Sequence, residues 1–265
     1  METRADIVKG FYAKYKEEER LDSDRQGQME YITTMHYIHE YLKPGNTIAE
    51  IGAGTGRISI ALAKEGYDVT AVEYSDDNYE KLEANIADVE NIRAYQGDAI
   101  NLSMLDNDSF DVVLLFGPMY HLYDCEEQAA ALREASRITK PGGTVLIAFL
   151  SVHAIMYTNY VCNRGGEFVD GFKHNFDERF EVKHFPEQLF TGFDIAEFET
   201  LVDASPLQRE KTVACDGMLE LAKLTPMFGL EGNENFEKFV AYHLATCERR
   251  ELLGLSSHLL CICHV

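Results

Sequence analysis

The sequence contains a group of glycines and acids that could bind a nucleotide. Gly52, Gly54 and Gly56 stand at alternate positions directly after an apolar run, near whose end lies Glu50. Because glycine has no Cβ and tolerates positive φ, such a turn lets a ligand lie against bare backbone. A second acid, Glu73, ends the next apolar run about 20 residues later, where nucleotide-binding sheets place a carboxylate for ribose hydroxyls.

The elements that would position these residues are those of a doubly wound sheet. Strands are expected at residues 47–51, 67–73, 92–96, 111–116, 144–150, 209–214 and 258–265. Helices are expected at residues 55–65, 75–87, 126–139 and 194–204, with two more helical patterns within 217–256. Strands that alternate with helices predict a largely parallel sheet, whose ligands bind at the carboxyl ends of the strands.

The order of the motifs resembles that of class I S-adenosylmethionine (SAM)-dependent methyltransferases. The glycine turn and Glu73 are followed by Gly97-Asp98-Ala99, by an apolar run from Phe110 to Pro118 and by Lys140-Pro141-Gly142-Gly143. The resemblance is close over residues 40–150 and loose elsewhere, and the lead-in at residues 19–34 resembles bacterial small-molecule members. It implies a Rossmann-like, seven-stranded, mostly parallel sheet whose last strand is antiparallel.

The chain is expected to form a single methyltransferase domain over residues 1–265. Its core would comprise residues 43–150, 194–216 and 257–265, and cap elements would come from a helical N-terminal segment and two insertions, at residues 1–42, 151–193 and 217–256. The caps are rich in aromatic residues, which suits a covered pocket.

The resemblance also implies roles in binding SAM. Glu50 would face the ammonium group, the backbone at Gly52, Ala53 and Gly54 would approach the amino acid and ribose, and Glu73 would accept hydrogen bonds from the ribose diol. The residues expected around the adenine are Tyr74, Asp98 and Ala99, and Phe116 is a further predicted cofactor-binding residue.

Catalysis of methyl transfer requires alignment and, for a protonated acceptor, a base. His121 is the leading candidate for that base, because it follows the apolar strand at 111–116 and titrates near neutrality. Tyr120 and then Tyr123 come next. The alternative is that His121 is hydrogen-bonded within its loop and holds a lid. Tyr15 and Tyr31 are predicted substrate contacts, unless they pack only against the first helix.

Composition argues against nucleic-acid and membrane partners. The formal net charge is −21, with 45 acidic against 24 Lys and Arg residues, so the basic footprint that phosphate binding needs is missing. The loop after residue 116 has Gly117 and Met119 where amino-group methylases of DNA carry an Asn or Asp and an aromatic residue. The six cysteines form no regular framework, which favours the cytoplasm.

No metal site is expected. Cys261-x-Cys263-His264 has ligand types suited to zinc, but two cysteines on an alternating apolar strand are more often core residues.

Two functions remain in view. The first is a SAM-dependent methyltransferase that acts on a small-molecule acceptor. The alternative is a SAM-binding regulatory or assembly protein without turnover. An NAD-dependent oxidoreductase is disfavoured because Gly56 comes one position too early for its glycine motif. The sequence leaves the acceptor and the oligomeric state open.

Overall fold

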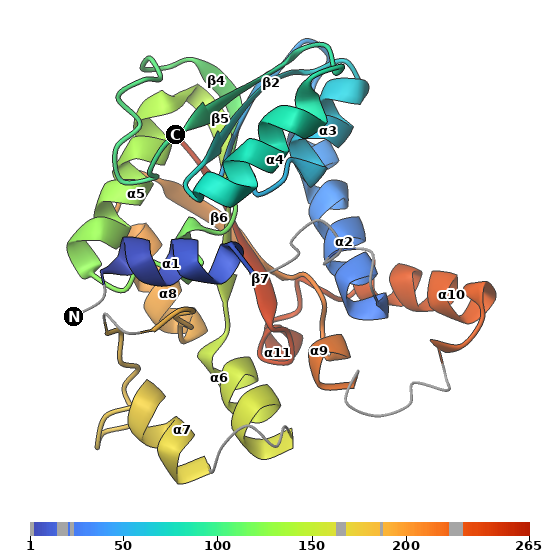
Figure 1. Cartoon of the computed structure of the whole chain (residues 1–265). Coiled ribbons are helices and arrows are strands. Elements are labelled where there is room, and N and C mark those ends of the chain that lie inside the picture. Colours follow the sequence, from blue (N-terminus) through green and yellow to red (C-terminus); the bar gives the residue numbers. More distant parts are fainter. Residues whose placement is uncertain (1–2, 15–20, 22–23, 163–167, 186–187, 223–229) are drawn as a thin grey trace.

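A mixed seven-stranded sheet forms the centre of the molecule (Figure 1). The computed structural model describes residues 3–14, 21, 24–162, 168–185, 188–222 and 230–265. The strand order is β3-β2-β1-β4-β5-β7-β6. The strands are β1 (Thr47–Ile51), β2 (Asp68–Glu73), β3 (Ile92–Gln96), β4 (Phe110–Leu115), β5 (Thr139–Leu150), β6 (Gln208–Ala214) and β7 (His258–His264).

The first five strands pair in parallel, and β7 runs antiparallel to both β5 and β6. This confirms the predicted fold class, including the reversed last strand. β5 begins at Thr139, earlier than the predicted residue 144, because one pair with Phe110 forms before the register shifts at Val112.

Helices cover both faces of the sheet. Figure 1 shows α5 (Cys125–Ile138) and α8 (Ile195–Asp203) on one side, and α2 (Arg25–Tyr41) and α3 (Arg57–Lys64) on the other. The remaining α-helices are α1 (Arg4–Tyr12), α4 (Asp76–Ile86), α6 (Val152–Ile155), α7 (Phe168–Asn175), α9 (Leu219–Ala222), α10 (Asn233–Leu244) and α11 (Arg250–Leu253). The prediction of two helical patterns in 217–256 was wrong, since α9, α10 and α11 lie there. α9 and α11 are single turns, too short to show a helical period.

Local side-chain chemistry fixes several helix starts. Asp194 caps α8 by accepting from the backbone N–H of Ala196, and Glu197 closes a capping box around the same turn. Asp24 caps α2 by accepting from the N–H of Gly27 at 2.9 Å.

The core lies between the sheet and its helices. Phe149 of β5 stacks on Phe198 of α8, with ring centroids 3.9 Å apart. Cys261 and Cys263 are fully buried in this core, whereas His264 hydrogen-bonds to Glu210. This arrangement agrees with the core interpretation of the two cysteines. Across the described residues, no helix has the length and apolar character required to cross a bilayer.

Three segments lie around the carboxyl ends of the central strands and thereby define the site. α1 crosses in front of them in Figure 1, close to α4. The loop that contains η2 (Pro118–Tyr120) follows β4. Residues 188–190 pack on that loop through the carbonyl of Leu189, which lies 2.6 Å from Nδ1 of His121, and the next residue, Thr191, donates its N–H to the carbonyl of Tyr120.

Candidate functional site

A cavity of about 730 Å³ opens at the carboxyl ends of the parallel strands. Its volume is in the roughly 300–1,000 Å³ range of small-ligand sites. Nearly all the predicted site residues line it: Tyr31, Glu50, Gly52, Ala53, Gly54, Glu73, Tyr74, Asp98, Ala99, Phe116, Tyr120 and His121. The predicted contact Tyr15 lies outside the described residues. Other lining residues, among them Arg4, Tyr12, Glu30 and His258, were not predicted.

The glycine turn lines the cavity and packs closely against the loop after β4. Gly52 has φ of +85°, and a Cβ placed on it would lie 2.1 Å from the carbonyl oxygen of Phe116. The N–H groups of Gly52 and Ala53 both donate to the carbonyl of Val72, which ties the turn to β2. Gly56, with φ of +92°, then caps α3. The turn therefore sits at the positive end of a helix, where backbone donors attract polar ligands.

Glu73 holds the glycine turn in place. Its buried carboxylate accepts from the N–H of Gly54 at 2.7 Å and from the N–H of Ser75 at 2.8 Å. A carboxylate offers roughly four acceptor positions. The same group can therefore organise the turn and accept hydrogen bonds from a diol.

We expect Glu73→Ala to weaken SAM binding by about 1.5–3 kcal/mol, the range for hydrogen bonds that involve a charged group. Isothermal calorimetry measures this loss directly. Glu83→Ala is the matched control, because Glu83 lies on α4 and accepts from Tyr79 at the surface. Unchanged affinity in a folded Glu73→Ala protein would contradict the ribose role.

Glu50 is a buried acid whose pKa is raised. Burial, together with the nearby charge of Glu73, raises the pKa of Glu50 to about 7, although hydrogen bonds with Ser59 oppose the shift. Ser59 of α3 donates its hydroxyl to the carboxylate. At neutral pH this group is therefore partly protonated, and a cationic ligand group beside it would favour the ionised form.

SAM affinity should consequently rise with pH and level off above about pH 7. Below the raised pKa, binding beside the ligand ammonium must first remove the proton from Glu50, which costs up to about tenfold in affinity per pH unit. Calorimetry between pH 5.5 and 7.5 in two buffers of different ionisation enthalpy would detect the released proton. Glu50→Gln should abolish both the slope and the proton release. A slope that survives in this variant would assign the titration to another group.

Two cationic side chains of α1, Arg4 and Lys9, cover the part of the cavity where the adenine is predicted to bind. Arg4 lies 2.6 Å from a carboxylate oxygen of Asp98, and its guanidinium sits 5.2 Å from the centroid of the Tyr74 ring. Lys9 lies 5.3 Å from the same centroid and pairs with Asp76. These contacts could not be predicted from local sequence patterns, since the partners lie more than 60 residues away. The adenine roles of Tyr74 and Asp98 stay predictions, now with α1 as their cover.

His121 joins two covering segments. Its Nδ1 lies 2.6 Å from the carbonyl oxygen of Leu189, and its Nε2 lies 3.1 Å from the hydroxyl of Tyr12. Because a carbonyl only accepts, Nδ1 carries the proton and Nε2 accepts from Tyr12. Burial, aided by the positive charge of Arg4, lowers the pKa of His121 to about 4 despite the bond to Leu189.

This geometry favours the fastening role of His121 over the base role. A base with a pKa near 4 is weak at neutral pH, and both nitrogens are held. Tyr120 lines the cavity beside it, with ring centroids 6.4 Å apart. Tyr31 also lines the cavity, and the guanidinium of Arg57 lies 4.9 Å from its ring centroid.

Comparisons with known proteins agree with this fold. Residues 48–143 match the family model described as a methyltransferase domain. Demethylmenaquinone methyltransferase of Corynebacterium efficiens is 35% identical over 114 residues, which are 43% of this chain and 46% of that protein. The Staphylococcus aureus protein of the same name is 34% identical over 109 residues, 40% of this chain and 43% of that protein. The matches thus span less than half of these relatives.

Two solved structures share the fold over most of the chain. A SAM-dependent methyltransferase of Methanosarcina mazei superposes with a TM-score of 0.56 at 18% identity, covering 86% of this chain and 96% of its own. A possible histamine N-methyltransferase of Thermotoga maritima gives 0.57 at 19% identity, covering 97% and 98%. Residues 48–143 therefore match a methyltransferase domain, and the chain as a whole has the fold of class I SAM-dependent methyltransferases.

SAM is the methyl donor of this family, and the residues present fit it. Any Cβ on Gly52 would clash with the carbonyl oxygen of Phe116, so only glycine lets the turn lie against the loop after β4. Buried Glu50 and Glu73 both line the same cavity. When bound, SAM supplies an electrophilic methyl group on a sulfonium. The glycine turn would hold it, and α1 and residues 188–190 would exclude water.

Proposed function

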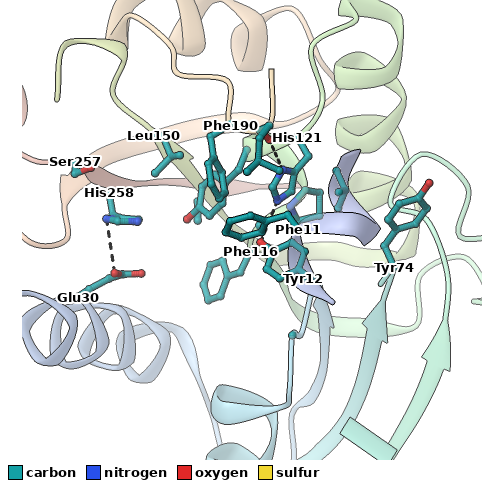
Figure 2. Close-up of a pocket in the computed structure, with 18 of the residues that line it drawn as sticks. Phe11, Tyr12, Glu30, Tyr74, Phe116, His121, Leu150, Phe190, Ser257 and His258 are labelled. Atoms are coloured by element: carbon teal, nitrogen blue, oxygen red, sulfur yellow. Dashed lines mark hydrogen bonds and ion pairs between the residues drawn. The ribbon is translucent and has the colours of Figure 1, made fainter. Parts of the chain in front are cut away.

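We propose that the protein is an enzyme that transfers a methyl group from SAM to a small aromatic acceptor. One observation carries the proposal. The cavity continues beyond the glycine turn into a part walled by Phe11, Phe116 and Phe190, here called the aromatic chamber. This chamber ends at the imidazole of His258. In Figure 2, Tyr74 and His258 lie at opposite sides of the view, with Phe11, Tyr12, Phe116 and Phe190 between them.

The aromatic chamber explains the choice of acceptor class. Phe11 of α1 packs edge-on against Phe190, with centroids 5.4 Å apart, and Phe190 lies 5.2 Å from His121. Such walls bind flat apolar rings, since aromatic pairs favour stacked and edge-on contacts at these separations. The name of the relatives suggests demethylmenaquinone as a first acceptor to try.

The surface charge supports a small molecule over a nucleic acid. At a net charge of −21 the protein would repel phosphate backbones. A cytoplasmic location of the protein would suit both the supply of SAM and the cysteines, which form no disulfide in the structure.

The test is turnover with radiolabelled SAM on a panel of phenols, naphthalenediols, demethylmenaquinone and aromatic amines. Transfer of label to one acceptor, with stoichiometric S-adenosylhomocysteine, would establish the enzyme. Tight SAM binding without label transfer to any acceptor would favour the regulatory alternative. Label transferred to duplex DNA or to RNA would contradict the small-molecule proposal.

A further inference from the structure

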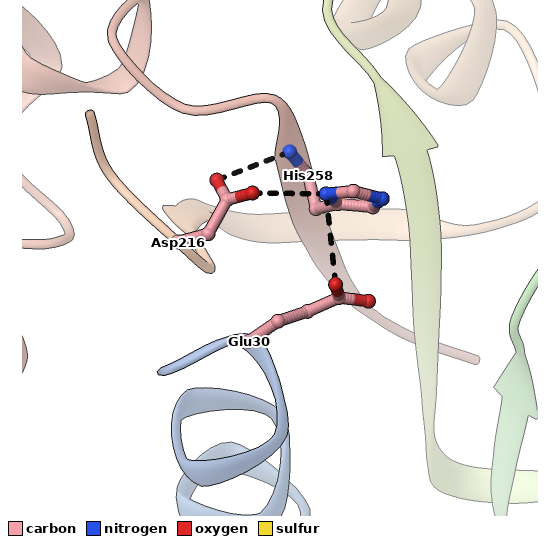
Figure 3. A group of neighbouring side chains, drawn as sticks. All are labelled: Glu30, Asp216 and His258. Atoms are coloured by element: carbon pink, nitrogen blue, oxygen red, sulfur yellow. Dashed lines mark hydrogen bonds and ion pairs between the residues drawn. The ribbon is translucent and has the colours of Figure 1, made fainter. Parts of the chain in front are cut away.

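A buried acid and a histidine meet in the cavity wall away from the glycine turn. Asp216 follows β6, and His258 begins β7. The pairing of these two strands brings them together, because the N–H of Cys215 donates to the carbonyl of His258. The Nδ1 of His258 lies 2.9 Å from a carboxylate oxygen of Asp216, which is fully buried, while His258 lines the cavity (Figure 3).

Asp216 is fixed by a set of donors. One oxygen accepts from the hydroxyl of Ser256 and from the N–H groups of Ser257 and His258. The other accepts from the amide of Gln26 at 2.7 Å and faces His258. Burial alone would raise the pKa of Asp216, but these hydrogen bonds outweigh it and the pKa is lowered. The carboxylate is therefore ionised.

The ionised carboxylate sets the tautomer of the histidine. Because Asp216 only accepts, Nδ1 of His258 carries a proton and the lone pair of the neutral ring lies on Nε2. Glu30 of α2 adds a second carboxylate 3.6 Å from Nδ1. Figure 3 shows both acids on the Nδ1 side, with Nε2 on the opposite edge of the ring.

The geometry points to His258, oriented by Asp216 and Glu30, as the catalytic base that takes the proton of a hydroxyl-bearing aromatic acceptor. This inference rests on the proposed methyl transfer. The acceptor O–H gives its proton to Nε2 and keeps the electron pair on oxygen, which becomes the stronger nucleophile. The resulting imidazolium is stabilised by two carboxylates, and nothing is oxidised or reduced.

The surroundings suit this assignment better than the role first predicted for His121. His121 is bonded to a carbonyl and a hydroxyl, neither of which stabilises an imidazolium as a carboxylate does. Among the described residues, the titratable groups packed around the His258 cluster or lining the cavity near it include Glu30, Tyr120, Cys215, Asp216, Glu220 and His243.

The same three side chains could also be considered for a metal, since the ligand atoms of Glu30, Asp216 and His258 all lie within 4.8 Å of one another. However, five donors already approach the two oxygens of Asp216. A carboxylate offers roughly four acceptor positions. A cation would have to displace these donors, so the proton-transfer role is favoured.

His258→Asn tests the base directly. Its amide can still donate to Asp216, but it has no basic nitrogen. Turnover on the acceptor from the panel should fall roughly 10²–10⁴-fold, while SAM affinity is kept. The low-pH decline of turnover should disappear, and added imidazole should restore part of the rate in His258→Gly. His264→Asn is the matched control on the same strand, because His264 also pairs with an acid, Glu210, away from the cavity.

A second readout does not depend on the acceptor. Long-range ¹H–¹⁵N spectra of the complex with S-adenosylhomocysteine should show His258 protonated at Nδ1 and unprotonated at Nε2. The opposite tautomer would overturn the inference, as would full turnover by His258→Asn or activity that requires a metal and is lost to EDTA. Absence of turnover in the wild-type protein would instead contradict the proposed function, while the tautomer would still decide the orientation of His258.

Discussion

Gly52→Ala is expected to abolish SAM binding and to lower the melting temperature by roughly 5–10 °C. The new Cβ would lie 2.1 Å from the carbonyl oxygen of Phe116 and 2.7 Å from Pro118. Backbone cannot yield as a flexible side chain can, so the turn must move away from β4. A positive φ costs a residue with a Cβ about 1–2 kcal/mol, and overpacking costs about 1–3 kcal/mol more.

Gly66→Ala separates these two causes. Gly66 has φ of +97°, but a Cβ there would meet nothing within 4 Å. The Gly66→Ala variant should therefore lose only the stability that a positive φ costs, about 1–2 kcal/mol, and should keep its affinity for SAM. Differential scanning calorimetry and SAM titration on both variants make the comparison. Equal losses of stability and equal SAM affinity in Gly52→Ala and Gly66→Ala would show that the contact of Gly52 with Phe116 and Pro118 does not constrain the turn.

Asp216→Ala should lower the free energy of unfolding by about 3–5 kcal/mol, the cost of removing one partner from a buried charged pair. The substitution leaves the donors of Gln26, Ser256 and His258 without their acceptor in a buried place. Because the pKa of Asp216 is lowered from 3.8, its contribution is present above that pH and is lost as the pH falls through the folded-state value.

Urea denaturation at neutral pH would measure this loss. Asp203→Ala is the control, because Asp203 also pairs with a cation, Arg209 at 2.8 Å, but is half exposed. Exposed pairs contribute about 1 kcal/mol or less. Equal effects of the two substitutions would show that the Asp216 cluster is not the buried network that holds His258.

The sequence was most informative where function depends on local spacing. The glycine turn, Glu73 and the alternation of strands with helices follow from residues close in the chain, so the sheet and its ligand edge were predictable. Arg4 and His258 were not, because their partners Asp98 and Asp216 lie far away in sequence and meet only after folding. His121 was found by position, but its tautomer and lowered pKa depend on Tyr12 and Leu189, which only the tertiary structure supplies.

The two hydrogen bonds of His121, one with Tyr12 and one with Leu189, have a kinetic consequence. One imidazole is hydrogen-bonded to both α1 and residues 188–190, so either segment gives up its own hydrogen bond to the ring when it moves away. Lid opening on the microsecond to millisecond timescale often limits turnover. Product release, rather than methyl transfer, should therefore set the maximal rate. Weakening the hydrogen bonds of His121 should speed the release of products and also admit water to the cavity.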